Sequence, residues 1–304
     1  MQNKQTVLIT GSNGQVGRNI SRVFDDSFDT IVFSSQDLDV GDETAIHRIF
    51  DVVRPDIVIN AAAHTKVDDA EIDTDLSDRA NFHAVKYLCD ACLKHDSLLV
   101  HFSTDYVFDG VATGLYSEDD RPNPLNAYGR SKFLSDNHII ENANQYLIFR
   151  LAWVYDHASV NFPKKILQAA LVKDRLTVVD DQIGTPTPAD LIAKTVHQLM
   201  AKEDAVKNQR YNSIFNLVPN GEASWFEFAF RLLTQAEDMG FDLKCKAKDL
   251  IPVNSSHFSQ LAKRPQRVVL DNSKIQRELG IRFASWHCYI DRFLDQMRRH
   301  NDRV

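Results

Sequence analysis

The chain begins with a short apolar run that leads into a glycine-rich turn. Residues Thr6–Thr10 are mostly branched and apolar, which is typical of a strand buried on both faces of a parallel sheet. Gly11, Gly14 and Gly17 follow in the pattern G-x-x-G-x-x-G. Such glycines allow a tight turn, close approach of the backbone to a pyrophosphate and close packing of the next helix. The segment therefore predicts a dinucleotide-binding strand, turn and helix, with a turn that binds nothing as the alternative.

Further apolar runs alternate with amphipathic segments up to about residue 155. We predict strands at 29–34, 57–60, 98–103 and 146–151, and helices at 44–53 and 81–94. This alternation is typical of an α/β fold with a doubly wound parallel sheet of the Rossmann type. We therefore expect a dinucleotide-binding domain over residues 1–154. Residues 155–304 are expected to form mainly a smaller α/β substrate domain, with some segments returning to the first domain.

Beyond residue 155 the pattern is looser. We predict helices at 161–173, 189–200 and 225–236, a short strand and a turn over 178–187, and a strand at 214–217. Trp153 and Tyr155, directly after the strand at 146–151, are candidates to line a substrate pocket. Arg264 and Arg267 place two cations in an extended segment, where they could grip an anionic substrate. Solvated surface cations are the alternative.

Composition excludes several classes of function. A net charge of -7 over 304 residues argues against general binding of nucleic acid or of an anionic membrane. No apolar run has the length needed to span a bilayer. Four cysteines are too few for a disulfide scaffold, so we expect a reduced, cytoplasmic setting. Cys89 and Cys92 form a C-x-x-C pair on the apolar side of a predicted helix, but no second cysteine or histidine pair stands at zinc spacing, and we predict no metal site. The acidic residues between 68 and 78 are expected on a solvated face.

The end of the second strand bears on the choice of cofactor. An NAD-selective site usually places a carboxylate there for the ribose 2′-hydroxyl. Here the strand ends in Ser34 and Ser35, and Asp37 and Asp39 come later. This leaves room for a 2′-phosphate, so we expect NADPH or NADH and favour NADPH. The small residues Ala61, Ala62 and Ala63 after the third strand would let the backbone lie against the cofactor. We place Asp39 and Val40 beside the adenine.

Tyr128 and Lys132 carry the predicted chemistry. Four residues apart on a helix, they lie on one face. A free phenol has a pKa of about 10, and a fixed ammonium nearby lowers it. The pair can therefore protonate a carbonyl oxygen while hydride reaches its carbon. A solvated surface pair is the alternative. Thr104 lies at the carboxyl end of the fourth strand, at the sheet edge where such folds bind ligands, and either Ser103 or Thr104 could hydrogen-bond the carbonyl.

Taken together, these motifs resemble the extended short-chain dehydrogenase/reductases and, within them, the dTDP-4-dehydrorhamnose reductase family. The matching segments run in the family's order over nearly the whole chain. They are 11–17 (GSNGQVG), 60–71 (NAAAHTKVDDAE), 103–110 (STDYVFDG), 124–132 (PLNAYGRSK), 149–155 (FRLAWVY), 181–187 (DQIGTPT) and Arg264-Pro265. The first and fourth occur in many sugar-nucleotide enzymes, whereas STDYVFDG, DQIGTPT and NAAAHTKVDDAE are more specific.

The resemblance implies reduction of the 4-keto group of dTDP-4-dehydro-L-rhamnose to dTDP-L-rhamnose. It implies a catalytic set of Thr104, Tyr128 and Lys132, with Tyr128 protonating the oxygen at C4 and Lys132 holding the nicotinamide ribose. The cofactor set would comprise Gly11, Gly14, Gln15, Val16, Gly17, Asp39, Val40, Ala61, Ala62, Ala63, Tyr128 and Lys132. The substrate set would comprise Thr104, Asp105 and Trp153, to which we add Arg264.

Three departures from the family pattern leave alternatives open. Ser34 stands where some members have Asp. Val268 replaces the Ser of an Arg-Pro-x-x-Ser pattern, which keeps a reductase of another deoxysugar nucleotide open. Asn19 stands where certain bacterial members have a glutamate for Mg²⁺ at a dimer contact, so a homodimer stays open without a predicted metal. A further alternative is a non-catalytic, nucleotide-binding regulatory subunit of the same fold. The intact Tyr128 and Lys132 argue against it.

Overall fold

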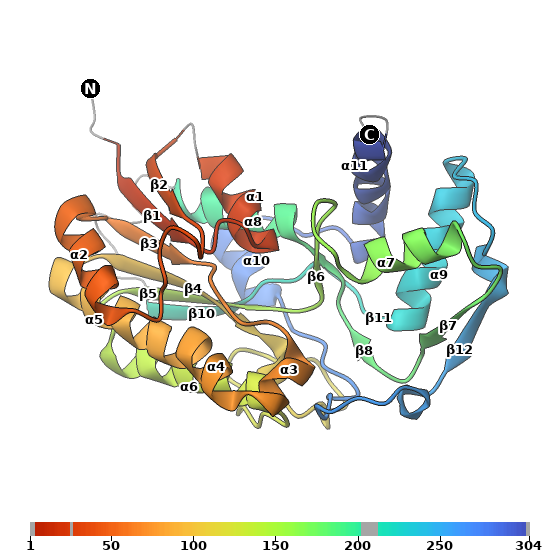
Figure 1. Ribbon diagram of the computed structural model, residues 1–304, viewed down its shortest axis with the longest axis horizontal. Coiled ribbons are helices and arrows are strands. Elements are labelled where there is room, and N and C mark those ends of the chain that lie inside the picture. The colour runs from red at the N-terminus through yellow and green to blue at the C-terminus, as the bar shows by residue number, and fades with distance from the viewer. Residues whose placement is uncertain (1–3, 25–26, 202–211, 302–304) are drawn as a thin grey trace.

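A parallel six-stranded sheet forms the centre of the computed structural model, which describes residues 4–24, 27–201 and 212–301. In pairing order its strands are β10 (Asn212–Asn216), β5 (Tyr146–Leu151), β4 (Leu98–Thr104), β3 (Ile57–Asn60), β1 (Thr6–Thr10) and β2 (Asp29–Phe33). Every neighbouring pair is parallel. The Rossmann-type fold class is confirmed, and the predicted strands match β1 to β5 to within one residue (Figure 1).

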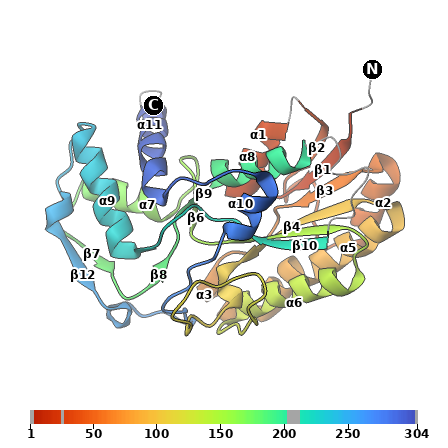
Figure 2. The ribbon, with the colours of Figure 1, turned by 180° about the vertical axis from the view of Figure 1, so that it is seen from behind.

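Helices cover both faces of this sheet because its central strands are apolar on both sides. Val7 and Ile9 of β1 join one core cluster, and Leu8 between them joins another, as the alternation of side chains along a strand requires. On the first face lie α1 (Gln15–Phe24), α8 (Ala189–Met200) and α10 (Ser273–Leu279); on the second lie α2 (Glu43–Val53), α5 (Ala84–His95) and α6 (Ala127–Asn142) (Figures 1 and 2). The sheet is thus a buried middle layer.

The strand order reverses beside β1, because β2 pairs on one side of it and β3 on the other. The chain segments that leave β1 and β3 at this edge come into backbone contact. Gly11 has a φ of +70°, and a Cβ atom there would lie 2.5 Å from the Ala62 nitrogen. A Cβ on Gly17 would lie 2.2 Å from the Gly11 oxygen. Ligands of open α/β sheets bind at such a reversal.

The segment between β3 and β4 forms a series of short helices along the same edge of the sheet. These are α3 (Val67–Ile72), α4 (Thr74–Asp78) and a π-helical turn (Arg79–His83) that runs into α5. A 3₁₀ turn (Asp105–Val107) follows β4 directly. The predicted helix at 81–94 therefore begins in the π-helical turn and continues as α5.

Most of the chain after residue 153 packs around a core of its own. Its helices are α7 (Phe162–Ala170), α9 (Trp225–Asp238) and α11 (Ile290–Asn301); its paired strands are β6 (Val154–Tyr155) with β9 (Thr187–Pro188), β7 (Leu176–Val179) with β12 (Leu250–Val253), and β8 (Ile183–Gly184) with β11 (Ala223–Ser224). Phe228, Trp286 and Phe293 are among its buried side chains. In contrast, β10, α8 and α10 pack with the large sheet. The division at residue 154 stays a prediction.

The contact at Gly11 predicts a large loss of stability when a side chain is added. In Gly11→Ala a Cβ would meet backbone atoms in a left-handed conformation, so we expect the free energy of unfolding to fall by about 3 kcal/mol. Gly280 is the matched control, since its φ is +69° but no atom lies within 4 Å of the added Cβ. Gly280→Ala should cost about 1 kcal/mol. Equal losses in urea unfolding would show that the contact is not the cause.

Candidate active site

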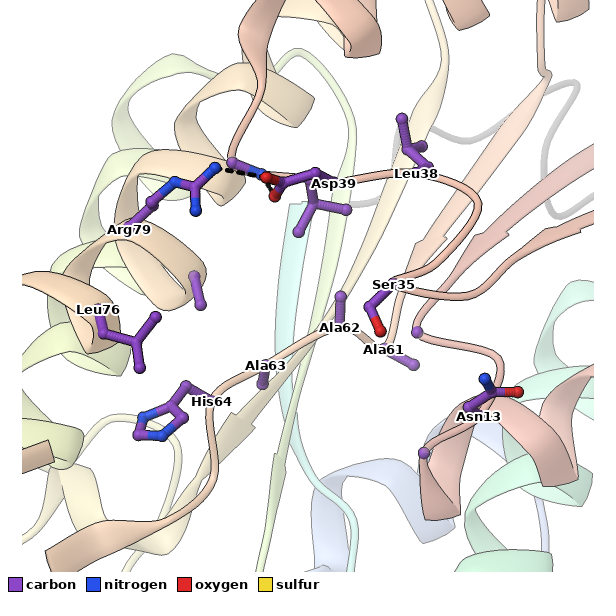
Figure 3. A pocket seen from close by; sticks show the side chains of 15 residues that line it. Asn13, Ser35, Leu38, Asp39, Ala61, Ala62, Ala63, His64, Leu76 and Arg79 are labelled. Carbon is purple, nitrogen blue, oxygen red and sulfur yellow. Dashed lines mark hydrogen bonds and ion pairs between the residues drawn. The ribbon is translucent and has the colours of Figure 1, made fainter. Parts of the chain in front are cut away.

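A pocket of about 360 Å³ opens where the strand order reverses. Gly11, Gly14 and the run Ala61–Ala63 line it together with Asp39 and Val40. Figure 3 shows the three alanines along one side, with Asn13 at one end of the pocket and Arg79 near the other. Because these lining residues are small, backbone is accessible to a ligand, and α1 begins beside them with N–H groups that favour phosphate. These residues fit a dinucleotide.

The predicted residues Gln15 and Val16 begin α1 next to this pocket. The Gln15 amide donates to the Val154 oxygen over 3.3 Å and accepts from Asn161 over 2.9 Å. Val16 packs against the core cluster on the α1 face of the sheet. The start of α1 is therefore tied to the segment that follows β5.

The far end of the pocket contains an ion pair that the sequence did not reveal. Arg79 of the π-helical turn pairs with Asp39, and both line the pocket (Figure 3). Asp37 accepts hydrogen bonds from the nitrogen and the hydroxyl of Ser34, over 2.9 and 2.6 Å. The Ser34 hydroxyl is thus engaged with a carboxylate three residues later, while Ser35 lines the pocket.

The start of α6 is fixed from three directions. Asn126 caps the helix by accepting from the Gly129 nitrogen over 2.7 Å, and its own amide donates to the Lys263 oxygen over 2.9 Å. Glu71 of α3 accepts from the Ala127 nitrogen over 2.6 Å. These contacts hold the first turn of α6, which carries Tyr128, against segments far away in the sequence. The prediction of a solvated face was therefore wrong for Glu71, because it caps a buried helix terminus.

Tyr128 is buried at the carboxyl end of β4. Its side chain shares a hydrogen bond with Thr104, and its ring lies edge-on to Tyr106 with centroids 5.8 Å apart. Burial raises the pKa of Tyr128 to about 12, and the hydrogen bond with Thr104 only partly offsets this. The expected lowering of this pKa by Lys132 was wrong, because desolvation is the larger effect. The phenol is consequently protonated at neutral pH.

Lys132 lies one turn further along α6 and is 1 % exposed. Its Nζ is 3.0 Å from Nε2 of His101, a residue of β4 whose other ring nitrogen is 3.3 Å from the Asn60 amide. Burial lowers the pKa of Lys132 to about 8, against the opposing effect of the Asp136 carboxylate. The ammonium is therefore less favoured here than in a solvated lysine.

Two predicted substrate residues, Asp105 and Trp153, line one narrow cavity. Asp105 is buried and accepts from the Thr104 hydroxyl over 3.0 Å, and burial raises the pKa of its carboxyl to about 7. Trp153 has a φ of +43° and stacks on Trp225 at the start of α9, with ring centroids 3.5 Å apart. The site after β4 thus contacts, through this pair of indoles, the core formed by the part of the chain after residue 153.

Arg264, the fourth predicted substrate residue, makes a two-pronged ion pair with Asp68 of α3. Its nitrogens lie 2.7 and 3.2 Å from the two carboxylate oxygens. The Asp68 side chain is 40% exposed, so the predicted solvated face holds for it, and the ion pair with Arg264 is an addition that the sequence did not predict. Arg267 instead pairs with Glu222 over 2.6 Å. Pro265, next to Arg264, lines the cavity of Asp105 and Trp153.

His101, Asn60 and Arg79 were not predicted as site residues. His101 could have been noticed as the one strongly polar residue inside the apolar run 98–102. Arg79 carries no such signal, because its partner Asp39 lies 40 residues earlier and only the fold brings them together. Within residues 4–24, 27–201 and 212–301, no cluster of three His, Cys, Asp or Glu residues is arranged to hold a metal, and no helix has the length and apolar character to cross a membrane.

The sheet, the dinucleotide pocket and the buried Tyr128–Lys132 pair define a reductase of the extended short-chain dehydrogenase/reductase class. Comparison with known proteins narrows this class to one family. The family model described as "RmlD substrate binding domain" matches residues 5–299. A dTDP-4-dehydrorhamnose reductase of Aggregatibacter actinomycetemcomitans is 33% identical over 92% of this chain and 95% of its own length. The chain belongs to the dTDP-4-dehydrorhamnose reductase family.

Solved structures agree with this assignment. The crystal structure of a dTDP-4-dehydrorhamnose reductase from Clostridium acetobutylicum has a TM-score of 0.88 and 32% identity, and covers 96% of this chain and 99% of its own. The enzyme from Bacillus anthracis, in complex with NADP, has a TM-score of 0.86 and 30% identity, with coverage of 96% and 99%. Fold and sequence therefore place the chain in one family along nearly its whole length.

The raised pKa of Asp105 predicts how stability depends on pH. Between about pH 4 and pH 7 the folded protein holds a proton on this carboxyl, whereas the unfolded chain has released it. The free energy of unfolding therefore falls as pH rises through this range. Asp105→Asn removes this dependence and keeps an acceptor for Thr104. From pH 5 to 7.5, its stability relative to the parent should rise by about 2 kcal/mol. Asp119→Asn, which removes an exposed carboxylate, is the control in urea unfolding; parallel curves for Asp105→Asn and the parent would contradict the assignment.

Proposed function

We propose that this protein reduces the 4-keto group of dTDP-4-dehydro-L-rhamnose and so forms dTDP-L-rhamnose. The main support is the buried, protonated phenol of Tyr128, hydrogen-bonded to Thr104 at the carboxyl end of β4. The identity of the substrate is inferred from the names of the relatives. When bound, NAD(P)H supplies the hydride. The domain that follows residue 154 is proposed to bind the sugar nucleotide mainly, with β10, α8 and α10 belonging to the first domain.

Tyr128 is proposed as the proton donor. A reductive step creates negative charge on the C4 oxygen, and a donor must be protonated before the hydride arrives. The high pKa that burial gives Tyr128 keeps its proton in place at neutral pH. Thr104 is proposed to hold the same oxygen, and a charged Lys132 to favour the phenolate that is left behind. Asp105 and Trp153 are proposed to contact the sugar.

Two alternatives are distinguished by specific residues. Val268 is buried, with 2 % exposed, at the position where the family pattern has a serine; a reductase of another deoxysugar nucleotide is the second candidate for this reason. A non-catalytic regulatory subunit would need neither the Tyr128 phenol nor the Lys132 side chain. Both are buried in place, which favours the enzyme.

The proposal is tested by following NADPH or NADH oxidation with dTDP-4-dehydro-6-deoxyglucose and the matching 3,5-epimerase, and by identifying the product by NMR. We expect dTDP-L-rhamnose. Tyr128→Phe should lower kcat by about 10²-fold or more, with the Kd for the cofactor retained. Cofactor binding without oxidation by the parent protein would reject this substrate and favour first a reductase of another deoxysugar nucleotide and then the regulatory subunit. Near-normal turnover by the variant would reject Tyr128 as donor.

Arg264 is proposed to act at the substrate rather than at the cofactor. Its side chain is 17% exposed, and the adjacent Pro265 lines the cavity of Asp105 and Trp153. Arg264→Ala should raise KM for the sugar nucleotide about tenfold, the loss of one charge-assisted contact, and leave the cofactor Kd nearly unchanged. Asp68→Asn, which breaks the ion pair but keeps the cation, is the control. An equal rise in KM in both variants would show that Arg264 acts only through Asp68.

A further inference from the structure

Three buried polar residues lie side by side across the centre of the large sheet. Thr10 of β1 is in register with Asn60 of β3, and Asn60 is in register with His101 of β4. Residues in register on adjacent parallel strands point to the same face. Leu8, two residues before Thr10, belongs to the cluster on the face of α2, α5 and α6. The polar row therefore faces the helix that carries Lys132.

Backbone geometry fixes the orientation of the Asn60 amide. Its oxygen accepts from the Thr10 hydroxyl over 2.7 Å and from the Ala62 nitrogen over 3.2 Å. The Ala62 N–H can only donate, so turning the amide over would set a donor against a donor. The Asn60 nitrogen must consequently face His101, and it lies 3.3 Å from Nδ1. Since an amide nitrogen only donates, Nδ1 of His101 is an acceptor and carries no proton.

This assignment determines what His101 presents to Lys132. Burial, and next the Lys132 charge, holds the pKa of His101 well below its ordinary value, so the ring is neutral. A neutral imidazole has one N–H, which must then be on Nε2, the atom 3.0 Å from Lys132 Nζ. An ammonium there would oppose one donor with another. The Ser135 hydroxyl, which donates to the Lys132 oxygen, offers a more distant acceptor 3.5 Å from Nε2. The lone pair of a neutral Lys132 amine is the nearer matching acceptor.

We propose that His101 is a positioning residue that favours the neutral amine form of Lys132 in this arrangement, and that at pH 8 and above binding of the nicotinamide cofactor is coupled to proton uptake by Lys132. The proton comes from solvent and forms an N–H bond at Nζ, while His101 keeps its own proton. This inference rests on the proposed function in one respect: Lys132 must be an ammonium when it serves the ribose and favours the Tyr128 phenolate.

The charges around Lys132 allow both protonation states. Asp136, one turn along α6, favours the ammonium. However, burial raises the pKa of Asp136, its carboxylate accepts from Ser103 over 2.7 Å, and Arg150 of β5 lies 3.9 Å from it. Burial raises the pKa of Asp105 after β4 to about 7, so this group is a carboxylate at pH 8 and 9, whereas the Tyr128 phenol stays neutral. The charge of Asp136, the carboxylate that favours the ammonium of Lys132, is opposed by Arg150.

Isothermal titration calorimetry tests the coupling. NADPH is titrated into the full-length protein at pH 7, 8 and 9, each in two buffers of different ionisation enthalpy, and the difference in heat counts the protons exchanged. With the pKa of Lys132 lowered to about 8 by burial, we expect uptake of about half a proton at pH 8, rising toward one at pH 9. Binding without proton uptake at all three pH values would overturn the proposal.

Two variants assign the proton. Lys132→Met should bind NADPH without uptake at pH 9. His101→Gln places a carbonyl oxygen near the position of Nε2, where it can accept from an ammonium, so the free protein should retain the charge and uptake should fall at least threefold. A His101 with a purely structural role would lower stability and leave the proton count unchanged. Unchanged uptake in either variant would overturn the proposal.

If the variants do not fold, the tautomer itself can be measured. Side-chain ¹⁵N shifts of His101 in the parent protein distinguish a proton on Nε2 from one on Nδ1. We expect Nε2–H without NADPH, and Nδ1–H would overturn the proposal. Because these readouts need only cofactor binding, they are independent of sugar turnover. A protein that reduces the sugar without proton uptake would refute this inference alone, whereas uptake without turnover would refute the proposed function alone.

Discussion

Backbone contact between the turn after β1 and the segment after β3 is the constraint on which the site depends. Gly11 meets Ala61 and Ala62 at distances that exclude a side chain. The same approach opens the dinucleotide pocket and brings the Ala62 N–H to the Asn60 amide. Through Asn60 it reaches His101 and then Lys132. One close contact of two chain segments thus shapes the pocket and is linked, through Asn60 and His101, to the hydrogen bonding of Lys132.

The sequence was most informative where local pattern and burial agree. Branched apolar runs predicted β1 and β3 to β5 because strands of a parallel sheet are buried on both faces. Helices α10 and α11 and strand β12 were not predicted, because short segments in the last part of the chain compete with turns and acquire their structure from packing on other elements. The contacts of α3 were also missed. Asp68 pairs with Arg264, 196 residues later, and spacing along the chain carries no information on such partners.

The sequence predicted that Tyr128 and Lys132 lie on one face of a helix, but it did not predict the direction in which their surroundings shift the pKa of the phenol. The spacing of Tyr128 and Lys132 placed both on one face of α6, as observed. It also suggested that the lysine lowers the pKa of the phenol, whereas burial raises it. Desolvation depends on how completely other elements cover a group, and the strand that covers Lys132 contributes His101. Charge in such a site is a property of the assembled layers, so a motif alone does not determine it.

The position of β10 at the edge of the large sheet has a consequence for how the protein is made. Its partner β5 ends at Leu151, and β10 begins at Asn212, so about sixty residues must leave the ribosome after β5 before that edge is covered. During this interval β5 (YLIFRL) would expose unpaired backbone groups along an apolar strand, the type of edge that recruits other chains. The nascent protein is therefore most vulnerable to aggregation over this interval, and a chaperone that binds extended apolar segments would have its clearest target there.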